Sequence, residues 1–78
     1  MYRIKTFTNI ETGVDSSFLI QKKKDGKYFG LICKKLPLVY TDKKHANKVK
    51  LWLEDNSDNH DYPDFIFEGI DKEWVKNL

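Results

Sequence analysis

The sequence predicts an α+β fold, with an antiparallel sheet of three to four strands and one main helix, about residues 43–54, packed on one face. Asp25-Gly26 joins two β-rich runs, and apolar residues recur at helical spacing after a good helix cap at Thr41-Asp42. A chain of 78 residues has room for one small core, so we expect a single domain over residues 1–78. A short C-terminal helix is expected over 72–78.

The clearest element is a hairpin made of residues 17–24 and 27–34. A two-residue Asp-Gly loop favours a type I′ turn, in which both central residues take positive φ. That turn fixes the register, so Phe18 is expected to face Cys33 on the core side of the sheet. The opposite side is mixed, and lysines surround the tip of the hairpin.

The other strands are less clear. Residues 2–8 alternate well enough for a strand, and residues 9–16 are expected to form a loop. Residues 36–40 are extended, but Pro37 cannot donate a ladder hydrogen bond, which makes this piece an edge strand or a connector. Residues 64–68 are aromatic and β-branched, which favours a strand over a helical turn.

In the helix, Ala46, Val49 and Leu53 share one face and are expected to point into the core. The charges along this helix are reversed relative to its dipole, because lysines gather near the N-terminal end while Glu54 and Asp55 lie at the C-terminal end. Two explanations fit this order: the lysines are kept for a partner, or they arose by drift, since exposed charges cost little.

The charge of the whole chain is also divided by position. Residues 1–50 carry 12 Lys and Arg against 4 acids, a net charge of +8, and residues 51–78 carry 2 against 8, a net charge of −6. Such a dipolar molecule acts on charged partners within a Debye length of roughly 8–10 Å at physiological salt. Recognition is therefore a better expectation than catalysis.

The sequence indicates no catalytic residues, no metal site and no cofactor. Cys33 is the one strong nucleophile and is predicted to lie in the core, where a thiol is inert. His45 has no acid spaced to orient it as a general base. Residues 55–66 superficially resemble a calcium loop, but His60 stands where that loop needs Gly and Ile66 where it needs a bidentate Glu. The four glycines are isolated, which excludes a phosphate-binding loop.

The leading hypothesis is a small, non-enzymatic protein-binding module. A concrete version is an inhibitor or adaptor that acts on a larger nucleic-acid-handling machine, for example a viral host-takeover or anti-defence protein of the kind made by phages. Two sets of side chains are the candidate contacts. The basic set consists of Lys22, Lys23, Lys24, Lys27, Tyr28, Lys43, Lys44 and Lys48. The acidic set consists of Glu54, Asp55, Asp58, Asp61, Tyr62 and Asp64.

The alternative function is a nucleic-acid-binding domain, in which the hairpin lysines grip phosphates, Tyr28 stacks on a base and the helix lysines follow the backbone. A single Arg and a pI of about 8.6 count against it. Homo-oligomerisation is a third possibility, through opposite charges or an exposed edge at residues 36–40. The lone cysteine and the lack of a long apolar run predict a cytoplasmic protein, in its own cell or a host, with no membrane partner.

Overall fold

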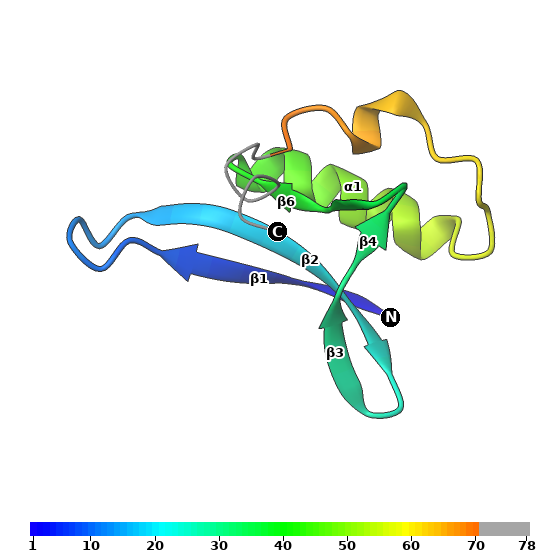
Figure 1. Cartoon of the computed structure of the whole chain (residues 1–78), viewed down its shortest axis with the longest axis horizontal. Coiled ribbons are helices and arrows are strands. Elements are labelled where there is room, and N and C mark those ends of the chain that lie inside the picture. The colour runs from blue at the N-terminus through cyan, green and yellow to red at the C-terminus, as the bar shows by residue number, and fades with distance from the viewer. Residues whose placement is uncertain (71–78) are drawn as a thin grey trace.

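The computed structural model describes residues 1–70 and confirms the α+β fold, with an antiparallel sheet packed against one main helix (Figure 1). The C-terminal helix predicted over 72–78 lies outside the described residues. In chain order the elements are β1 (Tyr2–Thr8), β2 (Asp15–Lys24), β3 (Lys27–Gly30), β4 (Ile32–Cys33), β5 (Leu36–Pro37), β6 (Val39–Tyr40), α1 (Lys43–Asp55) and the 3-10 helix η1 (Asp64–Ile66).

The long strand β2 is the centre of the sheet. β1 pairs with one of its edges, and β3 and β6 share the other. The predicted register of the hairpin is confirmed between Gln21↔Gly30 and Lys24↔Lys27. At the turn, Asp25 and Gly26 have φ values of 52° and 80°. A type I′ turn requires positive φ at both positions, which Gly adopts without steric cost.

Beyond Leu31 the predicted register is wrong. Instead of continuing to a Phe18–Cys33 pair, the chain leaves β2 and forms a second small hairpin from β4 and β5. The backbone N–H of Leu38 donates to the C=O of Leu31 at 3.0 Å and closes the neck of this excursion. β6 then returns to β2, where Phe18 pairs with Tyr40. This path buries Cys33, Pro37 and every residue of 38–40, and the burial of their apolar surface favours it.

The predicted helix is confirmed as α1, which begins after Asp42 and extends one residue past the expected end. The side chain of Asp42 accepts a hydrogen bond from the Lys44 N–H at 3.0 Å, as an N-cap should. The apolar face of α1 packs on the sheet, and the core between them contains Ala46, Val49 and Leu53 from the helix and Tyr2, Phe18, Ile20, Cys33, Leu38 and Tyr40 from below. Burial of Cys33 is therefore confirmed, although its strand partner differs.

The strand expected at residues 64–68 is wrong, since residues 64–66 form η1. Ile66 is fully buried, and both Phe65 and Phe67 pack against the core. Three consecutive side chains cannot all turn inward from a strand, where they alternate between faces, but a tight helical turn allows it. The hydroxyl of Tyr40 donates to the C=O of Ile66 and ties η1 to β6.

Candidate interaction surfaces

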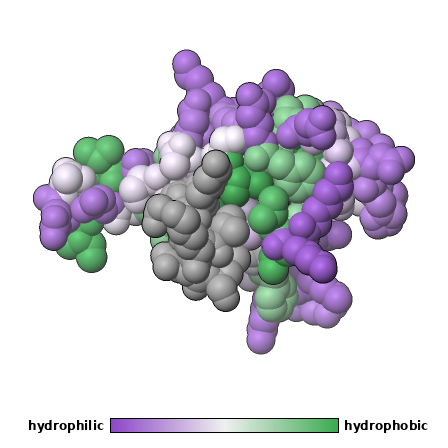
Figure 2. All heavy atoms as spheres, turned by 45° about the horizontal axis from the view of Figure 1, so that its top comes forward, coloured by the Kyte–Doolittle hydropathy of each residue, from purple (hydrophilic) through white to green (hydrophobic). Residues whose placement is uncertain are grey.

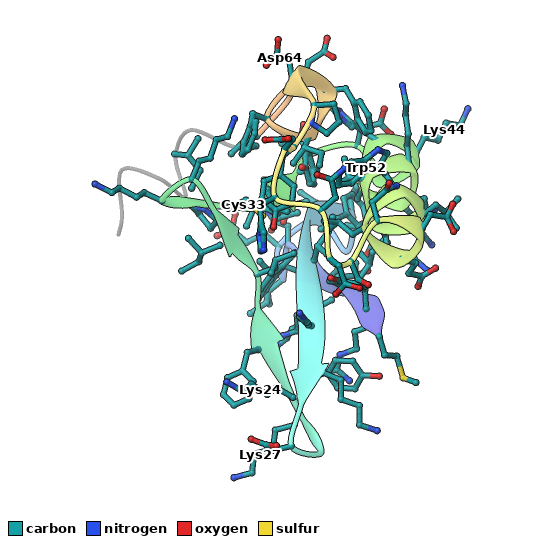
Figure 3. All side chains as sticks on the ribbon, turned by 90° about the vertical axis from the view of Figure 1, so that its right-hand side faces the viewer. Lys24, Lys27, Cys33, Lys44, Trp52 and Asp64 are labelled. Carbon is teal, nitrogen blue, oxygen red and sulfur yellow. The ribbon has the colours of Figure 1, made fainter. Side chains whose placement is uncertain are left out.

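The β2–β3 hairpin projects from the body of the molecule and forms a hairpin arm, residues 22–29 (Figures 1 and 3). Lys24, Asp25, Lys27 and Phe29 line an open hollow on this arm. Phe29 faces the same side of the sheet as the core, yet α1 does not reach it, and 54% of its surface is exposed. The arm therefore presents an aromatic ring beside two predicted site lysines.

Tyr28 lies on the other face of the arm and is already engaged. The guanidinium carbon of Arg3 is 3.8 Å from the centre of its ring, and the ammonium of Lys23 is 5.9 Å away. The Nε of Arg3 also donates to the side-chain oxygen of buried Gln21 at 2.6 Å. The guanidinium of Arg3 thus occupies one side of the Tyr28 ring, which was predicted to stack on a base.

Arg3 and Lys5 are exposed on this sheet face, and the sequence-based site did not include them. The alternation of residues 2–8 signals that the two share a face. Only the β1–β2 register, with Arg3 opposite Gln21 and Lys5 opposite Leu19, brings Arg3 to the ring of Tyr28, and the loop between those strands carries no turn motif that would fix it.

The helix lysines surround the positive end of α1. No acidic residue lies in the first turn of the helix, which contains Lys43 and Lys44. Lys44 and Lys48 line a shallow hollow with Glu68 and Gly69, and the Lys48 ammonium is 4.9 Å from the ring centre of Phe65. These lysines are exposed, as a contact role requires.

Beside them, His45 has a structural role. Its Nε2 donates to the C=O of Phe65 at 2.8 Å, and its ring lies 4.8 Å from that of Tyr40. Nε2 must carry the proton, because a carbonyl oxygen can only accept. His45 therefore joins α1 to the η1 segment.

The lysines of the hairpin arm and those of α1 do not form one continuous face. Lys24 and Lys27 lie at one end of the molecule and Lys44 at the other (Figure 3). The loop over residues 56–63, yellow in Figure 3, runs between the two lysine groups in that view. It carries Asp58 and Asp61, which are exposed, and it follows Glu54 and Asp55 of α1. Asp64 is the exception among the acidic set, since it lies toward the Lys44 end (Figure 3).

Few of these charges neutralise each other. Within residues 1–70 a single ion pair forms, Lys50 to Glu54 at 3.3 Å, between consecutive turns of α1. An exposed pair of this kind contributes about 0.3–0.5 kcal/mol. Most of the basic and acidic side chains of the described chain therefore remain available to a partner.

Tyr62 differs from the rest of the acidic set because it is half-buried. Its ring centre lies 6.0 Å from that of Trp52 and 6.5 Å from that of Phe67. Burial raises the pKa of Tyr62, with a further contribution from the nearby Cys33 thiol. Burial also raises the pKa of Cys33, partly offset by a hydrogen bond with Tyr62. A buried thiol with a raised pKa is unreactive, in agreement with its predicted place in the core.

A second projection lies at the β1–β2 connection, at the left of Figures 1 and 2. It exposes two aliphatic side chains, Ile10 at 99% and Val14 at 62%. The Asn9 side-chain oxygen holds the turn by accepting from the Glu11 N–H at 2.8 Å. The sequence predicts only a loop for this segment, because single apolar residues in a polar loop carry no periodic signal.

Comparisons with known proteins give no assignment: no protein-family model matches the chain, and neither the curated proteins nor the solved structures yielded a match. Within residues 1–70, no helix is long and apolar enough to span a membrane. The same residues contain no group of three or more His, Cys, Asp or Glu side chains placed to hold a metal ion.

Proposed function

We propose that the protein is a small, non-enzymatic protein-binding module that contacts its partner through the hairpin arm. The observation that supports this most is Phe29, more than half exposed on a projecting hairpin and lining a hollow with Lys24 and Lys27. Protein interfaces concentrate their energy in aromatic anchors surrounded by a polar rim. The matching partner surface is an apolar pocket with an acidic border.

The concrete form of this module is an inhibitor or adaptor, which acts by covering a surface on a larger machine. The unpaired charges of both signs support this version, since they attract a partner before contact and orient it. The separation of the hairpin arm from the helix lysines disfavours the nucleic-acid alternative, because one phosphate backbone following both groups has to pass the acidic loop.

The test compares Phe29→Ala with Leu51→Ala, because Leu51 is an equally exposed apolar residue on α1, at 56% against 54%. Tagged wild type and both variants are used to capture partners from cells that express the protein, and the affinity for any stoichiometric partner is then measured. We expect Phe29→Ala to weaken binding by about 30-fold or more, the effect of truncating an anchor, and Leu51→Ala to leave it unchanged.

Two results would overturn the proposal. One is the recovery of no stoichiometric protein at moderate salt. The other is an equal affinity of wild type and the Phe29→Ala variant, which would place the interface elsewhere. Titration with DNA and RNA oligonucleotides in low salt examines the alternative, and an affinity tighter than about 100 μM that depends on Lys24 and Lys27 would favour it.

A further inference from the structure

β1 forms an outer edge of the sheet, and no strand within residues 1–70 pairs with its outward side. In the order β1-β2-β3, β1 is terminal and pairs with β2 alone. Figure 1 shows it along the border of the sheet, with no described strand beyond it. Seven residues, Tyr2–Thr8, make this a long edge for so small a protein.

The hydrogen bonds of β2 show which β1 groups point outward. The N–H of Ile20 donates to Leu38, and the C=O of Ile20 accepts from Leu31, each at 2.9 Å. Both groups thus point away from β1, so Ile20 and its opposite residue Ile4 form a non-hydrogen-bonded pair. By the alternation of an antiparallel ladder, Tyr2, Ile4 and Thr6 direct their N–H and C=O groups to the open edge.

The side chains along this edge divide by face. Arg3 and Lys5 are exposed on the face opposite α1. Lys23, whose backbone N–H donates to the C=O of Met1, lies on the same face. On the α1 face, Ile4 packs against the core. Burial raises the pKa of Tyr2, and the nearby charges of Cys33, Asp58 and Glu54 raise it further. The α1 face is therefore acidic near the start of β1.

We propose that β1 accepts an extended segment of a partner protein as an added strand, and that this segment alternates acidic and apolar residues. The acidic side chains would lie beside Arg3 and Lys5, and the apolar ones beside Ile4. The proposal builds on the protein-binding function and names a surface that does not include Phe29. Charge complementarity selects this occupant over a second copy, because antiparallel pairing of two β1 strands about Ile4 would place Arg3 opposite Lys5 of the copy.

The probe is a capped synthetic peptide of sequence TEVEVT, added to the full-length protein and followed by amide hydrogen exchange and NMR shifts. In the free protein, the amides of Ile4 and Thr6 should exchange faster than those of Arg3 and Lys5, which face β2. The acidic peptide should slow the two fast amides. The matched peptide TKVKVT, with the charges reversed, should leave them unchanged.

Two variants separate backbone pairing from charge. Thr6→Pro removes one outward N–H without removing a bond to β2, and should abolish peptide binding while the remaining amides keep their protection. Lys5→Glu should weaken binding about tenfold, as two opposite-charge contacts become repulsive. Phe29→Ala should bind the peptide as wild type does, so this experiment and the test of the hairpin arm fail independently.

Three results would overturn the inference. One is fast exchange at Ile4 and Thr6 that the acidic peptide does not change. Another is equal protection by the acidic and basic peptides, which would show pairing without charge selection. The third is protection in the free protein that increases with protein concentration, which would identify a second copy as the occupant.

Discussion

The protein contains two tight hairpins that reach the same turn geometry by different means. At the β2–β3 turn, Asp25 and Gly26 have φ of 52° and 80°, and at the β4–β5 turn, Lys34 and Lys35 have φ of 49° and 66°. Asp-Gly favours this geometry, whereas a non-glycine residue in the left-handed region costs roughly 1–2 kcal/mol. The first hairpin extends into solvent. The second has its strand residues Cys33 and Pro37 in the interior.

The difference indicates what holds each hairpin. Local turn chemistry stabilises the hairpin arm, which is why it can project with few contacts and leave Phe29 exposed. Tertiary burial stabilises the β4–β5 hairpin against an unfavourable turn, with Leu38 fully buried at its neck and the Lys34 ammonium 5.0 Å from the ring centre of Phe67. A hairpin that depends on burial is part of the core, and one that depends on its turn is free to contact a partner.

The largest effect is expected for Leu38→Ala. Removal of this fully buried side chain at the neck should lower the free energy of unfolding by about 2–5 kcal/mol, because the surrounding core collapses only partly into the cavity. The matched control is Ile32→Ala on the same hairpin, where the side chain is 64% exposed and a change within about 0.5 kcal/mol is expected. Urea unfolding of both variants measures this, and equal losses would show that burial does not hold the second hairpin.

A smaller effect is expected from exchanging the turn residues. Gly26→Ala should destabilise the protein by roughly 1–2 kcal/mol, because its φ of 80° strains any side chain even though the space around it is open. Lys35→Gly should do the opposite and stabilise by about 0.5–1 kcal/mol, after the entropic cost of glycine in the unfolded chain. Thermal unfolding of the two variants checks the signs, and a loss of stability in Lys35→Gly would contradict the strain at this turn.

The same contrast explains what the sequence could predict of the fold. The Asp-Gly turn and the register up to Leu31 were predictable, as were α1 and its Asp42 cap, because each has a local signal. The turn at Lys34-Lys35 has none, since two lysines give no indication of positive φ. The η1 segment was misassigned because aromatic and β-branched residues favour strands on average, while here Ile66 and its neighbours are held by tertiary contacts with Tyr40 and Trp52.

For the candidate surfaces, the sequence identified charge but not its arrangement. The lysines of the arm and of α1 were predictable as exposed. Their placement at opposite ends depends on how the hairpin arm leaves the sheet, which no local pattern encodes. The contact of Arg3 with Tyr28 depends on the β1–β2 register. The exposure of Phe29 depends on where α1 ends relative to the sheet, which no local pattern predicts.

The smallest expected effect is a pH dependence from Cys33, which tests whether the β4–β5 hairpin stays buried in solution. Burial raises the pKa of this thiol in the folded state, and an unfolded chain has a thiol pKa of about 8.5. Above that value the unfolded chain loses its proton first, so it binds fewer protons than the folded chain and stability falls as pH rises. The loss reaches at most about 0.8 kcal/mol at pH 9 and is absent below about pH 7.5.

Cys33→Ala isolates this contribution, because the variant retains every other titrating group. Its cost from the smaller side chain is independent of pH, so the difference between wild type and variant should be constant from pH 6 to 7.5 and should shrink by pH 9. The range stops below pH 10, where the tyrosines begin to ionise in the unfolded chain. A difference that stays constant through pH 9 would mean that the thiol titrates equally in both states. The β4–β5 hairpin would then be open to water like the hairpin arm, and burial could not be what offsets its strained turn.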